Sequence, residues 1–280
     1  MPGILLRIPY IQNKVSEVAT TQLSGHLGVP VKIGNVDIEW FNRLVLEGLY
    51  LEDQDGKVMF EANHVAAGFE IMPLLEGKFV FTTVRLFGFS FNLRKHTPES
   101  PLNLQFVIDA FASKDSIKKE KNIDLRFNSI MIRRGNFSYN VDSEKETPGK
   151  FNAKHIDIKN LSAKISLKAF NKDSVNAHIK KMSFDEASGF SLNKLSLNVV
   201  GNRDSAFVQD FEVRLPQTDL KIGRARIDLS EIDSLPALLN NAPIDLNITP
   251  SQICLKDLSP CVPAFKNFAG TIDLSAGANG

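Results

Sequence analysis

The sequence predicts a mainly β fold, a long curled antiparallel sheet that forms a groove, with an amphipathic helix in front and a few short helices between strands. Two observations predict it. After Gly28 the apolar residues recur at every second position, and this alternation continues almost to the end of the chain. Most intervening positions are polar, so each strand has one apolar and one polar face. Such a long apolar face must be covered by a second sheet, by closure of the sheet, or by a ligand.

The composition is that of an ordinary globular chain. It has 280 residues, 43% of them hydrophobic, and its 33 Lys and Arg against 32 Asp and Glu give a net charge of +1. The length allows about two domains. A near-neutral balance disfavours nucleic acid as a partner, because nucleic-acid binding needs a concentrated basic surface. No apolar run in the sequence is long enough for a membrane-spanning helix.

The first element is a helix predicted from about Tyr10 to Leu27. Its apolar stripe recurs at three- and four-residue spacing. The stripe contains Ile11, Val15, Val18 and Leu23. We expect this helix either to cap the mouth of the groove or to lie at a bilayer surface, and Ile4, Leu5 and Leu6 to be the end of a spanning helix whose earlier part is missing. We also expect the chain to be truncated at its C-terminus.

The rest of the chain predicts well over a dozen short strands. Gly48 stands where a bulge would shift the alternation between Leu46 and Leu49. The most apolar strand runs from Phe79 to Arg94, with its phenylalanines at odd positions. Short helices are expected over residues 102–113, 231–241 and 257–268.

The aromatic residues are strongly biased towards phenylalanine, with 20 Phe against 3 Tyr and 1 Trp. Protein-recognition surfaces favour Tyr and Trp, which carry polar atoms, whereas a face that stays dry or contacts acyl chains does not need them. An ordinary sandwich core is the alternative explanation. The predicted groove-lining residues are Phe79, Phe81, Phe87, Phe89, Phe91, Leu125 and Phe127.

The sequence contains no recognisable catalytic or metal-binding motif. The five histidines are scattered, and Asp53-Gln54-Asp55-Gly56 begins like a calcium loop but lacks the closing Glu, so a hairpin turn is favoured. Two basic spots, residues 132–135 and 223–226, indicate a solvated sheet face or contacts with lipid headgroups. Cys254 and Cys261 are either free thiols or a local disulfide. We therefore expect no enzyme, no metal and no cofactor.

Several ordered motifs in about the first 115 residues are similar to those of AsmA-like proteins, and within them to the inner-membrane subunit of the translocation and assembly module. The motifs are Leu6-x-x-Pro9-x-x-Gln12, Leu27-Gly28-x-x-Val31-x-Ile33-Gly34-x-Val36, Leu44-x-Leu46-x-Gly48-Leu49-x-Leu51-x-Asp53, Pro73-Leu74-Leu75-x-Gly77, Val84-x-Leu86 and Leu102-Asn103-Leu104. Beyond them, Leu258, Pro263 and residues 270–274 resemble a family repeat.

The resemblance implies a periplasmic segment of an envelope protein of Gram-negative bacteria, anchored in the inner membrane. Residues 1–28 would be the membrane-proximal helix, 29–115 the family's N-terminal β segment ending in a helix, and 116–280 a continuing groove. Such proteins shield phospholipid in an apolar β-groove during transport between the inner and outer membranes. Alternatively, the chain is a scaffold for outer-membrane protein assembly and secretion. The implied partners are phospholipid, the inner membrane, and an outer-membrane barrel protein met through a missing C-terminal domain. A closed two-sheet binding module is a third hypothesis.

Overall fold

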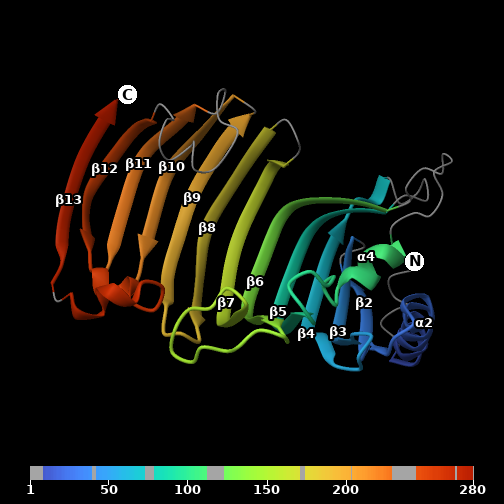
Figure 1. Cartoon of the computed structure of the whole chain (residues 1–280). Helices are drawn as coiled ribbons and strands as arrows, with labels where there is room; N and C mark the ends of the chain where they lie inside the picture. Colours follow the sequence, from blue (N-terminus) through green and yellow to red (C-terminus); the bar gives the residue numbers. More distant parts are fainter. Residues whose placement is uncertain are drawn as a thin grey trace. The chain divides into compact units, whose positions relative to one another are not determined.

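The computed structural model describes residues 9–39, 42–72, 79–111, 123–170, 174–202, 204–228, 244–268 and 270–279. Within these residues, thirteen strands form one open sheet, in which β1 is followed by β3 and then by β4 to β13 in chain order, while β2 pairs with β3 (Figure 1). The predicted mainly β class with one long sheet is confirmed.

The strands are β1 (Val31–Lys32), β2 (Asn35–Glu39), β3 (Arg43–Glu52), β4 (Val58–Phe69), β5 (Phe79–Lys95), β6 (Ile123–Val141), β7 (His155–Phe170), β8 (Ser174–Glu186), β9 (Ser191–Asn202), β10 (Ser205–Arg214), β11 (Asp219–Asp228), β12 (Ile244–Ile253) and β13 (Ile272–Asn279). The helices are α2 (Pro9–Leu27), α4 (Gln105–Phe111) and the 3₁₀-helices η1 (Leu255–Leu258) and η2 (Pro263–Asn267).

Several strands are longer than predicted, whereas β5 agrees with the strand predicted from Phe79 to Arg94 to within one residue. β5, β6 and β7 contain 17, 19 and 16 residues. The sequence suggested three short strands between Ile123 and Val141, but they are one strand, β6. The apolar positions change between odd and even numbers twice within this strand. The first change lies between Phe127 and Ile130, where the register with β5 shifts. The second lies at Arg134, which has a positive φ of 51°.

One strand pair departs from the predicted antiparallel arrangement. β5 and β6 are parallel, with Phe79 opposite Ile123 and Lys95 opposite Val141. A parallel pair needs a long crossover, and the connection between β5 and β6 contains α4. The local alternation of apolar residues is the same for both directions, so it did not reveal the parallel pair.

Two of the three short helices predicted after the first helix fall on described residues. α4 lies inside the predicted range 102–113. The helix predicted over 257–268 is replaced by η1 and η2, separated by Ser259–Val262. The helix predicted over 231–241 lies outside the described residues.

Close contacts divide the chain into two compact units. Unit 1 comprises residues 1–147 and 152–161, and unit 2 comprises residues 148–151 and 162–280. The predicted segment boundaries near residues 28 and 115 stay predictions.

In unit 1, α2 covers the outer edge of β1 partly through hydroxyl groups. Its Leu23 and Leu27 pack against the buried cluster of Val31, Ile33 and Val36. The Ser24 hydroxyl accepts the Val31 N–H at 3.0 Å, and the Thr20 hydroxyl accepts the Ile33 N–H at 3.2 Å. These contacts satisfy main-chain donors that an uncovered strand edge would expose.

The predicted stripe of α2 is only partly correct. Leu23 faces the sheet, but Val18 is exposed to solvent. The side chains of Ile11 and Val15 lie outside the described part of the structure. Thr20 and Ser24 also contact the sheet, and the place of the stripe at a membrane stays a prediction. None of the described helices is long and apolar enough to cross a membrane.

Candidate functional site

Unit 1 contains an apolar face that crosses four strands, β3 to β6. Cross-strand partners in a sheet point to the same side. Two rows of partners define this face. They are Leu46–Val65–Leu86–Ile132 and Leu51–Phe60–Phe91–Phe137. Because Leu46 and Leu51 pack against the same buried cluster, both rows lie on one side of the sheet. We call these eight residues the unit 1 apolar face.

The two rows share a face although an odd number of positions separates their residues in each strand, as between Leu46 and Leu51. In a regular strand, such residues would point to opposite sides. Between them lie Gly48 in β3, Gly88 in β5 and Arg134 in β6, with φ values of 62°, 57° and 51°. A left-handed residue inside a strand acts like a bulge and shifts the alternation by one position. The apolar residues before and after each of these positions therefore stay on one face. The alternation therefore changes at Gly48 as predicted, but the expected bulge is absent, because the register of β3 with β4 continues unchanged from Glu47 to Leu49.

The same shift corrects one predicted groove residue. Phe87 precedes Gly88 and pairs with His64 and Arg133. It follows Leu86 directly in the strand, and consecutive residues point to opposite sides of the sheet. It therefore points to the side opposite Phe91, where the Arg134 guanidinium lies 4.2 Å from the centre of its ring. The prediction that all odd-numbered phenylalanines of this strand share a face is wrong for Phe87.

Phe89 lies on the predicted face but is part of the sheet's own packing. Its side chain is buried, and its ring is 6.1 Å from that of Phe60, centre to centre. It lies directly over Gly135, where an added Cβ would overlap the ring. Phe89 thus fills the space that the glycine leaves on the neighbouring strand.

The more accessible rings of this face are Phe60, Phe91 and Phe137, all partly exposed. Phe91 makes edge contacts with the other two, at centre distances of 5.7 Å to Phe60 and 6.2 Å to Phe137. Each such aromatic pair contributes about 0.5–1.5 kcal/mol beyond burial of its area. Phe60 and Phe137 were absent from the predicted lining, because only the register of the strands brings them beside Phe91.

The other four predicted lining residues belong to β5 and β6. The backbone of Phe79 lies opposite Ile123, and that of Phe81 lies opposite Leu125. The side chains of Phe79, Phe81, Leu125 and Phe127 lie outside the described part of the structure, so their place in the lining stays a prediction.

Unit 2 has an apolar face of the same kind. In β9, Leu195, Leu197 and Val199 share one side of the sheet, and their partners in β8 and β10 are apolar. We call the following residues the unit 2 apolar face: Ala177, Ile179, Met182, Leu195, Leu197, Val199, Val208, Phe211, Val213, Leu220 and Ile222. All of them are partly exposed.

A left-handed residue shifts the alternation in unit 2 as well. Asp210 has a φ of 53°, and it separates Val208 from Phe211, which both belong to the unit 2 apolar face. Phe207 is on the opposite side, with the Arg226 guanidinium 5.3 Å from its ring centre. Arg134 and Arg226, which belong to the two predicted basic spots, thus both contact a phenylalanine on the polar side of the sheet.

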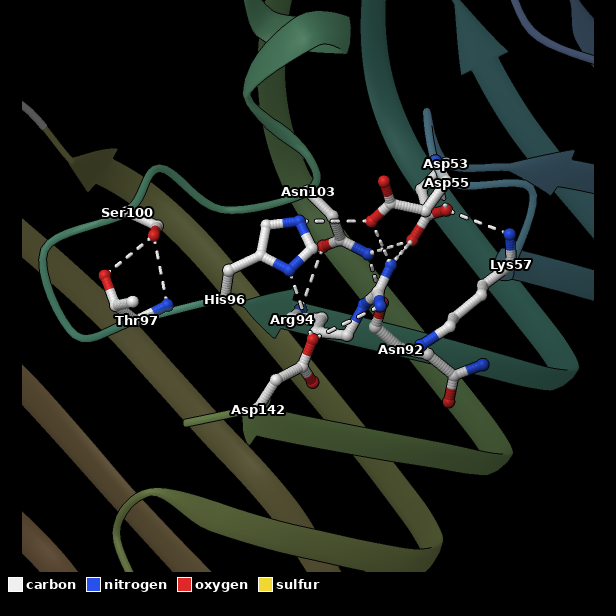
Figure 2. Close-up of polar contacts among 10 residues, drawn as sticks. All are labelled: Asp53, Asp55, Lys57, Asn92, Arg94, His96, Thr97, Ser100, Asn103 and Asp142. Atoms are coloured by element: carbon white, nitrogen blue, oxygen red, sulfur yellow. Dashed lines mark hydrogen bonds and ion pairs between the residues drawn. The ribbon is translucent and has the colours of Figure 1, made fainter. Parts of the chain in front are cut away.

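A polar cluster centred on Arg94 holds one end of β5 in unit 1 (Figure 2). The Arg94 guanidinium lies 2.9 Å from Asp53, 2.6 Å from Asp55 and 3.3 Å from Asp142. His96 lies between Asp55 and Asp142, at 3.2 and 3.3 Å. These contacts join the turn after β3, the end of β5 and the end of β6.

Asp53 is the buried member of this cluster, with 2% of its surface exposed. Its side chain accepts the N–H groups of Asp55 and Lys57, at 3.0 and 2.9 Å, and the Asn103 amide at 3.0 Å. Burial alone would raise the pKa of Asp53. The hydrogen bonds from Asn103, Lys57 and Arg94 outweigh burial, so this pKa lies below its usual value.

The Asp53–Gly56 segment is therefore a hairpin turn whose buried carboxylate is paired with Arg94. The described residues contain no group of three or more His, Cys, Asp or Glu suited to hold a metal ion. The sequence did not link this turn to Arg94, which lies 41 residues further on.

Both cysteines are free in the structure. The backbone N–H of the buried Cys254 donates to the Thr218 hydroxyl at 3.0 Å. Cys261 is exposed, and partial burial together with the charge of Glu186 raises the pKa of its thiol. The thiolate, the reactive form, is therefore disfavoured at neutral pH.

No protein-family model, curated protein or solved structure matches the chain. The site features that the structure describes are therefore the two apolar faces, with their partly exposed side chains, and the Arg94 cluster.

Proposed function

We propose that the chain binds the acyl chains of lipids along the apolar face of its sheet. The observation that carries this proposal is the unit 1 apolar face, where Phe60, Phe91 and Phe137 are adjacent, partly exposed and without polar atoms. Each acyl CH₂ group moved from water onto such a surface contributes roughly 0.8 kcal/mol. A ladder of rings on neighbouring strands offers this surface without a specific pocket.

The finer proposal is that of a phospholipid conduit. The sheet would curl into a groove that shields acyl chains, as a periplasmic segment of an inner-membrane-anchored, AsmA-like protein that carries phospholipid between inner and outer membranes. Two features support it. One long open sheet is compatible with the groove that the sequence resemblance implies, and apolar faces occur in both units.

The alternative proposal is a scaffold for outer-membrane protein assembly with a barrel partner. In the described sheet, β13 is hydrogen-bonded to β12 along one side. A client strand could add to the other side through main-chain hydrogen bonds. Photo-crosslinkers along β13 that capture unfolded barrel proteins would favour this alternative.

The decisive experiment compares two phenylalanines on one strand. A photo-crosslinking benzoylphenylalanine replaces either Phe91, on the apolar face, or Phe87, on the polar side. The chain is expressed in bacteria, irradiated and examined by mass spectrometry. We expect lipid adducts from position 91 and few or none from position 87, because acyl chains would contact only the apolar face.

Native mass spectrometry of the unmodified chain, purified without detergent, measures bound phospholipid independently. Equal labelling from positions 87 and 91 would contradict the assigned face. A lipid-free mass, together with no adduct from position 91, would reject lipid binding and leave the scaffold or a closed binding module.

A further inference from the structure

The connection between β12 and β13 carries apolar side chains that the core of unit 2 does not use. It lies at one end of these strands, drawn in red in Figure 1, and contains η1 and η2, neither of which has a buried residue. Val262 is 40% exposed and Phe268 is 54% exposed. Single exposed apolar residues are common on protein surfaces, so only a group of them indicates a binding surface.

These residues form a patch with two further phenylalanines. Phe265 and Phe268 are in edge contact, with ring centres 5.9 Å apart. The Phe265 N–H donates to the Val262 carbonyl at 2.9 Å. The exposed Phe151 is held beside them, because its N–H donates to the Pro260 carbonyl at 3.0 Å. We call Phe151, Val262, Phe265 and Phe268 the β12–β13 patch.

Lysines accompany the patch. Lys256 belongs to η1, Lys266 belongs to η2, and Lys150 precedes Phe151. Within the described part of the chain, their ammonium groups make no ion pair. Several carboxylates are close by. Asp257 accepts the Gln217 N–H at 2.8 Å, Asp273 follows on β13, Glu146 lies four residues before Lys150, and the charge of Glu186 acts on Cys261. The patch therefore combines apolar rings with available positive charges.

We propose that the β12–β13 patch binds the surface of a lipid bilayer that contains anionic lipid. Its phenylalanines and valine enter the boundary between headgroups and acyl chains, and its lysines lie near the lipid phosphates. Phenylalanine is common at protein interfaces too, but lysine is depleted there, so the lysines beside the rings favour a bilayer over a protein partner. This surface is separate from the unit 2 apolar face and does not depend on lipid binding there.

Vesicle co-sedimentation of the whole chain tests the proposal. The probes are vesicles of phosphatidylglycerol and phosphatidylcholine in equal parts, and vesicles of phosphatidylcholine alone. We expect binding to the anionic vesicles, weakened by salt. The double variant Val262→Asp/Phe268→Asp should bind at least about tenfold more weakly, because two side chains that enter the bilayer become charged. Lys256→Glu/Lys266→Glu should lose the preference for anionic vesicles.

Val200→Asp is the matched control. Val200 is 41% exposed, the same as Val262 within a per cent, and it lies on the polar side of β9. This control should bind vesicles like the unchanged chain. Circular dichroism and thermal unfolding establish that the variants retain the β fold, as expected for changes at exposed positions.

Three results would overturn the proposal: no sedimentation of the whole chain with anionic vesicles, unchanged binding by Val262→Asp/Phe268→Asp, or an equal loss in Val200→Asp. A fourth contradicting result would come from sedimentation velocity without vesicles. If the chain forms a dimer and Val262→Asp/Phe268→Asp abolishes it, the patch binds a second copy of the chain. The proposed function is tested separately, by the lipid adducts of benzoylphenylalanine at position 91. A chain that gives those adducts but does not sediment rejects only this inference.

Discussion

Arg94 shows how a single residue can stabilise unit 1 at a point where three segments meet. Its guanidinium contacts Asp53, Asp55 and Asp142, while its backbone N–H donates to the Asn103 side chain at 2.9 Å. Asp53 is buried, so removing Arg94 would leave a carboxylate with a much less favourable environment. Breaking a buried ion pair in this way is strongly destabilising, even where the intact pair itself adds little net stability.

We predict that Arg94→Gln lowers the free energy of unfolding at pH 7 by about 3 kcal/mol. Because the pKa of Asp53 is depressed in the folded state, its stabilising effect is fully present above its unfolded pKa of about 3.9. This contribution is lost as pH falls through the folded pKa. The difference between Arg94→Gln and the unchanged chain should therefore shrink below about pH 4.

Urea unfolding at pH 7 and at successively lower pH values measures this difference. Arg43→Gln is the control, since Arg43 makes a partly exposed ion pair with Glu39 at 3.2 Å. Its loss should cost at most about 1 kcal/mol. A similar cost for both variants, or a difference that does not change with pH, would show that Asp53 does not depend on Arg94.

At the scale of elements, left-handed residues inside strands decide which side chains share a face. Gly48, Gly88 and Arg134 lie in one row across the unit 1 sheet, with Asn63 of β4 between Gly48 and Gly88. Glycine adopts this conformation easily, whereas a residue with a side chain does so at a cost. Without these shifts, the apolar residues of each strand would point to both sides of the sheet.

The packing of Phe89 over Gly135 is a further link between β5 and β6. We predict that Gly135→Ala destabilises the chain by about 1–3 kcal/mol, because the added methyl group overlaps the Phe89 ring and forces it to move. Thermal or urea unfolding measures the effect. The smaller side chain in Phe89→Leu should make the double variant less unstable than the sum of the two single changes.

Gly277→Ala is the comparison variant. No atom lies within 4 Å of the Cβ that it would add, and Gly277 has no positive φ. It should therefore leave stability nearly unchanged. Equal destabilisation by Gly135→Ala and Gly277→Ala would mean that contact with Phe89 is not the cause.

The sequence was sufficient to predict features with a local signal. Alternation identified the strands, and helical spacing identified α2. Gly48 marked a change of alternation because glycine stood where the apolar residues moved from even to odd positions, although the strand register continues there without a bulge. Arg134 gave no comparable signal, since a left-handed arginine cannot be distinguished from an ordinary strand residue. The side occupied by Phe87, the hydroxyl contacts of α2 and the parallel pairing of β5 with β6 all depend on contacts between distant segments.

Taken as a whole, the molecule repeats one arrangement in both units. In each, a strand carries a left-handed residue, with a phenylalanine on the apolar face after it and one on the polar side before it. Phe91 and Phe87 flank Gly88 in unit 1, and Phe211 and Phe207 flank Asp210 in unit 2. In both units an arginine lies over the ring on the polar side. A site confined to one unit would not need this repetition, but a lipid-binding surface that continues along the chain would.

The repetition predicts the outcome of crosslinking in unit 2. Benzoylphenylalanine at position 211 should give lipid adducts, and the same probe at position 207 should give few or none, because only Phe211 belongs to the unit 2 apolar face. The yields are compared by mass spectrometry with those from positions 91 and 87. If position 91 labels lipid but position 211 does not, lipid binding is confined to unit 1. The proposal of a conduit along the chain would then be rejected, while that of a local lipid-binding site in unit 1 would remain.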